Sequence, residues 1–103
     1  MDYVFAGLQQ LVQGRMITVF VGAGCKTCEH VKALLPRLDF HPLVLDVSDV
    51  SPVVLQRCGI RTLPTIVRTQ TDPRDGDSPV AVMRSFSASA ERCLDDIRRF
   101  AEW

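Results

Sequence analysis

The sequence predicts an α/β protein: a four-stranded mixed β-sheet flanked by helices, in the order α-β-α-β-α-β-β-α. Helical patterns of apolar residues alternate with short, continuously apolar segments, which are typical of strands covered on both faces. The last two strand candidates follow one another across a polar loop, which indicates an antiparallel pair. At 103 residues, 47% of them hydrophobic, the chain forms one domain, residues 1–103, with a single modest core.

The first half of the chain contains two helix candidates and two strand candidates. Apolar residues recur at helical spacing over residues 2–14, where a glycine ends the pattern. "MITVFV", residues 16–21, is rich in β-branched and aromatic residues and has no charged residue, so it is expected to be a buried strand. A second helix is expected over residues 25–38, with a kink or a near end at Pro36. "HPLVLDV", residues 41–47, is the second strand candidate.

Two further helices are expected in the second half. Residues 51–59 have Ser51 as a helix cap, Pro52 at the first helical position and a glycine at the end. Residues 87–103 carry an apolar stripe at helical spacing, and Ser87 is the expected cap.

The strand candidates of the second half are residues 64–69 and 80–86, joined by the polar loop 70–79. Strands joined through a helix are expected to be parallel, with a right-handed crossover, and the final hairpin is expected to be antiparallel.

The charge balance argues against two classes of partner. Twelve Lys and Arg against twelve Asp and Glu give a formal net charge of zero, so no general attraction to nucleic acid or to an anionic membrane is expected. The apolar runs are far shorter than the ~20 residues of a membrane-spanning helix, and the N-terminus lacks the basic region of a signal peptide. Four cysteines in a core-rich chain favour a reducing compartment. We therefore expect a cytoplasmic protein.

The main functional candidate is "GCKTC", which opens a helix directly after a buried strand. Cys25 is expected at or just before the first helical turn, where free N–H groups and the helix dipole favour a thiolate. Residues three apart on a helix share a face, so Cys28 lies within disulfide range and one turn deeper. Cys25 is then the nucleophile and Cys28 the resolving thiol. Lys26 and Thr27, between them, are expected to tune the thiolate and the redox potential.

Two stretches resemble the thioredoxin and glutaredoxin superfamily, and the resemblance covers nearly the whole chain. "ITVFVGAGCKTC" is similar to the strand and active-site turn of a glutaredoxin, and "CGIRTLPTIV" to the cis-proline segment of thioredoxins. The resemblance implies a thioredoxin-like fold in which Pro64 is cis and faces the cysteines. It also implies that the backbone of Leu63 pairs with an extended substrate segment. With Arg61 and Thr62, these residues form the expected substrate-binding segment.

The function implied is that of a thiol–disulfide oxidoreductase that reduces protein disulfides and serves electron transport and cell redox homeostasis. The implied electron donor is a thioredoxin reductase or glutathione. The only cofactor expected is the redox-active Cys25–Cys28 disulfide itself, and the protein is expected to be a monomer.

Several positions depart from the family pattern. Gly24 and Thr27 replace the tryptophan and proline that thioredoxins carry, and Val19 replaces a buried aspartate that assists proton transfer. "RSFSASAE", residues 84–91, lacks the glycine of the glutathione-binding segment of glutaredoxins. These departures leave open an alternative: a thioredoxin-like protein-binding module with vestigial redox activity.

The remaining cysteines and basic residues have simpler interpretations. Cys93 lies on an apolar helix stripe and is expected in the core, whereas Cys58 is either buried or a partly exposed regulatory thiol. Arg61 either is solvated or attracts acidic partners. A metal site built from Cys25, Cys28 and His30, with Cys58 or Cys93, is disfavoured, because no second pair of ligands follows at short spacing. We therefore expect no metal, and an iron–sulfur or zinc carrier is the third hypothesis.

Overall fold

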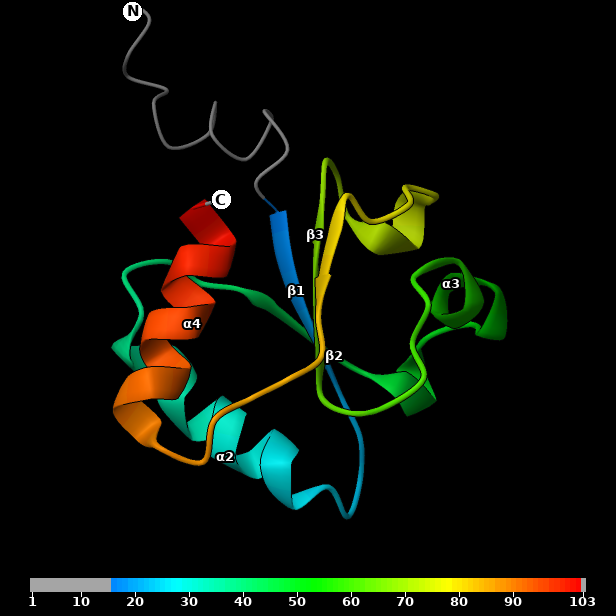
Figure 1. Ribbon diagram of the computed structural model, residues 1–103. Helices are drawn as coiled ribbons and strands as arrows, with labels where there is room; N and C mark the ends of the chain where they lie inside the picture. The colour runs from blue at the N-terminus through cyan, green and yellow to red at the C-terminus, as the bar shows by residue number, and fades with distance from the viewer. Residues whose placement is uncertain (1–15, 103) are drawn as a thin grey trace, which may run out of the picture.

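The computed structural model describes residues 16–102. Within this range the elements follow the expected order, from a first strand to a last helix, and the sheet lies between helices on both faces (Figure 1). The helix expected over residues 2–14 lies outside the described residues. No helix within residues 16–102 is both long enough and apolar enough to cross a membrane.

The sheet has four strands in the order β2-β1-β3-β4. The central strand β1 pairs in parallel with β2 and antiparallel with β3, and β4 pairs antiparallel with β3. The predicted mixed four-stranded sheet is therefore confirmed. The strands are β1 (Met16–Val21), β2 (Leu43–Asp46), β3 (Thr65–Thr69) and β4 (Ala81–Met83).

The expectation that strands joined through a helix run parallel is correct for β1 and β2 but wrong for β2 and β3. Because β1 is parallel to β2 and antiparallel to β3, the chain runs in opposite directions in β2 and β3. The six-residue helix between them, α3 (Pro52–Arg57), packs on one face of the sheet. A parallel β3 would require the chain to return to the end of the sheet where β2 starts, and the chain does not do so. The direction of β3 brings its first residue to the end of the sheet where β1 finishes, since Thr65 aligns with Phe20.

Two longer helices cover the other face, on the left in Figure 1. The first, α2 (Lys26–Leu34), ends just before a short 3₁₀-helix (Leu35–Arg37) that contains Pro36, as expected for a proline inside a helical pattern. The second is α4 (Ala90–Glu102), and the serine that caps it is Ser89 instead of the expected Ser87. Ser89 accepts the N–H of Arg92 and its carbonyl accepts the N–H of Cys93. Ser87 is therefore not the cap, and its hydroxyl instead accepts the N–H of Ser89.

Alternating strand residues give the sheet an apolar core on each face. One core lies between the sheet and α2 with α4, and it contains Val19, Cys28, Val31, Ile66, Cys93, Leu94 and Ile97. The other lies beneath α3, and it contains Phe20, Leu45, Val50, Val54, Cys58 and Val67.

Two strands are shorter than the sequence predicted. β2 begins only at Leu43, after Pro42, which has no N–H to donate to a strand pair. β4 covers only Ala81–Met83, short of the expected residues 80–86, because pairing with β3 extends only from Ala81 to Met83. The loop 70–79 also contains a short 3₁₀-helix, Pro73–Asp75, capped by Asp72, which its composition did not predict.

Candidate active site

A tight turn leads from the end of β1 into α2. Gly24 has φ of 72°, a left-handed conformation that glycine adopts without strain. Cys25 follows in an extended conformation as the N-cap residue of α2. The predicted position of this cysteine at the start of a helix is confirmed.

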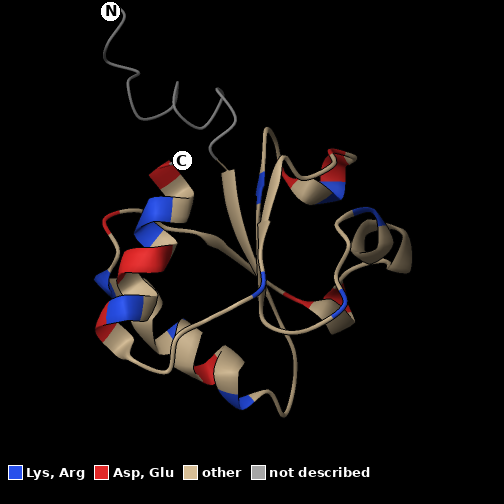
Figure 2. Ribbon diagram, in the orientation of Figure 1, with Lys and Arg blue, Asp and Glu red and all other residues tan. Residues whose placement is uncertain are grey.

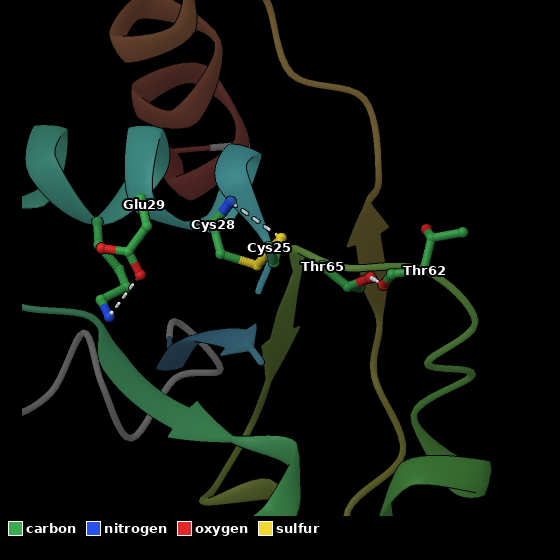
Figure 3. The surroundings of a disulfide bond; sticks show 6 residues. Cys25, Cys28, Glu29, Thr62 and Thr65 are labelled. Carbon is green, nitrogen blue, oxygen red and sulfur yellow. Dashed lines mark hydrogen bonds and ion pairs between the residues drawn. A yellow bond between two sulfur atoms is a disulfide. The ribbon is translucent and has the colours of Figure 1, made fainter. Parts of the chain in front are cut away.

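The two cysteines of this turn form a disulfide, with Cα atoms 5.2 Å apart. The backbone N–H of Cys28 donates to Sγ of Cys25 at 3.1 Å, so this sulfur occupies the place of a capping oxygen (Figure 3). The side chain of Cys25 is partly exposed, whereas Cys28 has no exposed surface. The first cysteine of the pair therefore lies partly at the surface, and the second lies in the core.

The surroundings of Cys28 are apolar. It belongs to the core cluster beneath α2 and α4, in which every member is hydrophobic. Val19, at the position where thioredoxins carry an aspartate, is fully buried in this cluster. Among residues 16–102 the only buried polar side chains are those of Thr18, Thr65 and Thr69, so no buried carboxylate or histidine lies in the core to accept a proton from Cys28.

The segment before β3 lies beside the disulfide (Figure 3). The Leu63–Pro64 peptide bond is cis. A Cβ atom added to Gly22 would lie 2.6 Å from Cδ1 of Leu63, so this leucine packs closely on the turn before the cysteines. The buried hydroxyl of Thr65 donates to the carbonyl oxygen of Thr62 at 2.6 Å and fixes the segment between them.

The other predicted site residues differ in exposure. Lys26, Thr27, Arg61 and Thr62 are exposed, whereas Pro64 is buried. Lys26 is the first residue of α2, directly after Cys25. Arg61 makes no hydrogen bond or ion pair with any other described residue.

The two other cysteines are buried thiols outside the pair. Cys58 ends α3 and has 1% of its surface exposed, so the partly exposed regulatory thiol considered from sequence is wrong. Cys93 is fully buried on α4, and its predicted core position is confirmed. Burial raises the pKa of both thiols.

Within residues 16–102, no three His, Cys, Asp or Glu side chains gather in a way that could hold a metal ion. Cys58 and Cys93 lie in cores on opposite faces of the sheet, so they do not complete a ligand set with the disulfide pair. His30 lies with Nε2 3.2 Å from the carbonyl oxygen of Ser87, in a contact between α2 and the segment before α4.

Three residues of this region were not identified from the sequence. From sequence Gly22 is only part of a strand-breaking turn, yet its missing side chain makes room for Leu63. The pattern places Thr65 in a strand and gives Arg84 no role, whereas Nη2 of Arg84 donates to the carbonyl oxygen of Gly59 at 2.9 Å. The only sequence signal for Thr65 is its place directly after Pro64. No local signal indicates the role of Arg84, because its contact with Gly59 spans 25 residues.

No protein-family model matches the sequence, and a search of curated proteins finds no match. Three solved structures resemble the chain. A thioredoxin pre-protein of Schistosoma mansoni has a TM-score of 0.56 and 18% identity, over 96% of this chain and 90% of that one. A thioredoxin of Malassezia sympodialis has a TM-score of 0.57 and 17% identity, over 94% and 85% of the two chains. Thioredoxin 1 of Thermosipho africanus has a TM-score of 0.51 and 19% identity, over 84% and 94%.

The strand order, the flanking helices and these structural neighbours agree with the fold expected from the two sequence motifs. The chain has the thioredoxin fold, with a Cys-x-x-Cys disulfide at the start of its helix α2.

Proposed function

We propose that this chain is a thiol–disulfide oxidoreductase that reduces protein disulfides through Cys25 and Cys28. The observation that carries the proposal is the asymmetry of the pair: one cysteine is partly exposed at a helix N-terminus and the other is buried one turn away. An attacking thiol needs access to the substrate, whereas a resolving thiol needs access only to its partner sulfur.

The reaction begins with both cysteines reduced. The Cys25 thiolate attacks one sulfur of the substrate disulfide, forming a mixed disulfide and releasing the other substrate sulfur as a thiolate. Cys28, once deprotonated, attacks Sγ of Cys25, which forms the Cys25–Cys28 disulfide and releases the second substrate sulfur. The substrate gains two electrons and, with protons from solvent, two thiols, while the protein loses two electrons.

The fold assists the first step at the sulfur of Cys25. Its Sγ accepts the N–H of Cys28, and the same hydrogen bond favours a negative charge on this atom when the disulfide is reduced. The dipole of α2 acts in the same direction. The exposed ammonium group of Lys26 adds positive charge next to it, and Thr27 completes the dipeptide that sets the redox potential.

The segment Arg61–Pro64 is proposed to hold an extended part of the substrate, with the backbone of Leu63 as its hydrogen-bonding partner. The proposed setting is the cytoplasm, where the protein works as a monomer in electron transport and redox homeostasis. A thioredoxin reductase or glutathione re-reduces the disulfide, and no further cofactor takes part.

A turnover assay tests this function. With dithiothreitol as electron donor, the protein is expected to accelerate the reduction of insulin disulfides above the rate with dithiothreitol alone. Cys25→Ser should abolish the acceleration, and Cys93→Ala, which removes a buried thiol outside the pair, should retain it. Equal rates for the wild-type protein and Cys25→Ser would refute the proposal.

A second candidate function is a binding module that uses the same surface with little redox activity. The observation that favours it is the fully buried Val19, which leaves the apolar cluster around Cys28 without a proton acceptor. A variant with serine at both positions 25 and 28 separates the two: a binding module would still hold its partner, whereas an oxidoreductase would lose its covalent intermediate.

A further inference from the structure

Basic side chains differ in how they are used across the structure. Within residues 16–102, ion pairs with carboxylates at N–O distances between 2.6 and 3.4 Å are formed by Lys32, Arg37, Arg74, Arg98 and Arg99. Around the disulfide, three exposed basic residues have no carboxylate partner among residues 16–102: Lys26, Arg61 and Arg84. The basic groups next to the disulfide are therefore available to bind an anion from outside.

Arg61 and Arg84 lie on the same side of the disulfide region. The guanidinium of Arg84 donates to the carbonyl oxygen of Gly59 at 2.9 Å, and Gly59 precedes Arg61 by two residues. Arg61 in turn begins the segment that continues through Thr62 to Leu63, which contacts the turn before Cys25. Figure 2 shows basic positions in the loop after α3 and just after β4.

Carboxylates lie toward the opposite edge of the same end of the sheet. Asp46 aligns with Val21, the last residue of β1, and Asp49 follows it in the turn after β2. Since β2 and β4 are the two edge strands, the disulfide lies between an acidic side near β2 and a basic side near β3 and β4. A substrate segment approaching the disulfide meets this charge difference.

We propose that the protein disulfides reduced best by this chain carry acidic residues next to the attacked cysteine, and that Arg61 and Arg84 bind those carboxylates. The inference rests on the proposed function and names its substrate class. Guanidinium groups bind carboxylates in two-pronged hydrogen bonds. Arg84 is also held in place by Gly59, so less side-chain entropy is lost when it binds a carboxylate.

Two synthetic peptides test the proposal. Each contains one intramolecular disulfide, and they differ only in carrying glutamate or glutamine beside each cysteine. The rate constant for reduction by the dithiol form of the protein is divided by the rate constant with dithiothreitol, which removes the intrinsic reactivity of each disulfide. At low salt the normalised preference for the glutamate peptide should be about threefold to tenfold, because two exposed ion pairs contribute little free energy each. Since salt screens exposed charges, the preference should shrink toward equality at about 0.5 M salt.

Charge-reversal variants assign the preference to the two arginines. Arg61→Glu should invert it, and Arg84→Glu should reduce it. Arg74→Glu is the control, because it makes the same change of charge at an exposed position in the loop between β3 and β4, at the other end of β3 from Thr65, and it should keep the preference. If both peptides are reduced with no normalised preference, or if Arg61→Glu and Arg84→Glu retain it, the inference is wrong while the proposed function stands. If neither peptide is reduced, the proposed function fails and the inference fails with it.

Discussion

The backbone N–H of Cys28 donates a hydrogen bond to the sulfur of Cys25, the residue that caps the same helix. The cysteine that we assign as nucleophile thus receives its hydrogen bond from the residue that we assign as resolving thiol. Any change to the side chain of Cys28 leaves this backbone donor in place. The attacking and resolving steps can therefore be separated by substitution.

Cys28→Ser should attack substrates but fail to complete turnover. The thiolate of Cys25 keeps its helix N-terminus and its N–H donor, but no second thiol releases the mixed disulfide. Mass spectrometry of the variant after incubation with a disulfide peptide should find the peptide attached through Cys25. Attachment at Cys58 or Cys93 instead, or none, would contradict the assigned roles.

Two buried threonines should respond in opposite ways to the same substitution. The hydroxyl of Thr65 donates to Thr62, so Thr65→Val leaves a carbonyl without its donor and should lower the free energy of unfolding by about 1–3 kcal/mol. The buried hydroxyl of Thr18 has no hydrogen-bond partner among residues 16–102, so Thr18→Val should leave stability unchanged or raise it by about 1 kcal/mol. Urea unfolding of both variants measures the difference.

Thr65→Val should also weaken activity, because it loosens the segment that precedes β3. Thr18 lies in β1 and belongs to no substrate-binding segment in our proposal, so Thr18→Val should keep wild-type turnover. Equal loss of activity in the two variants would show that the Thr65 hydrogen bond has no special part in positioning Leu63 and Pro64.

Gly22→Ala tests the contact between the active-site turn and Leu63. The added Cβ would lie 2.6 Å from Cδ1 of Leu63, so this side chain must shift. Because misplacing a positioning group by 1 Å can slow a reaction by up to about 10²-fold, kcat/KM for insulin reduction should fall about tenfold. Only the end of a flexible side chain moves, so the free energy of unfolding should change by about 1 kcal/mol or less.

Gly76→Ala should lower stability and leave activity unchanged, which is the reverse of the result expected for Gly22→Ala. Gly76 has φ of 110° in the loop between β3 and β4, and an added Cβ meets nothing within 4 Å. This substitution should lower the free energy of unfolding by about 1–2 kcal/mol through backbone strain and leave kcat/KM unchanged. A Gly22→Ala variant with normal kcat/KM would contradict the role given to Leu63.

The buried thiols should make stability depend on alkaline pH. Burial raises the pKa of Cys58 and Cys93 above the ordinary value of 9.0, so the unfolded chain loses these protons at a lower pH than the folded chain does. The stabilisation is complete below pH 9 and is lost as pH rises through the folded pKa. The urea midpoint should therefore fall as the pH rises above 9.

Lysine and tyrosine also titrate in this range, so a variant comparison isolates the thiols. The double variant with alanine at positions 58 and 93 should show a smaller fall in the urea midpoint than the wild-type protein. The disulfide is kept oxidised in both. An equal fall in the two proteins would contradict the protonated, buried state of these thiols.

The sequence predicted the elements that local pattern determines. β1 has its expected bounds, because a short segment rich in β-branched and aromatic residues and followed by glycines favours a buried strand. The start of α2 at the first cysteine and the end of that helix before Pro36 also follow from local rules. The position of the cysteine pair at the end of a buried strand could therefore be predicted without the structure.

What the sequence could not predict depends on contacts between distant residues. The direction of β3 is determined by which edge of β1 it joins, and the helix before it leaves that choice open. Ser87 and Ser89 are equally good caps by composition, and only the path of the chain into α4 selects Ser89. The charge difference across the disulfide region likewise arises only when Arg61, Arg84 and Asp46 are brought to one end of the sheet.

A redox titration of the Cys25–Cys28 pair tests the central claim most directly. The protein is equilibrated in glutathione or dithiothreitol buffers of known potential, free thiols are trapped, and the fraction of disulfide is measured. We predict one reversible two-electron transition between about −270 and −120 mV, the range of known thiol–disulfide oxidoreductases, and its loss in Cys25→Ser. A pair that stays wholly oxidised or wholly reduced across this range would contradict the account.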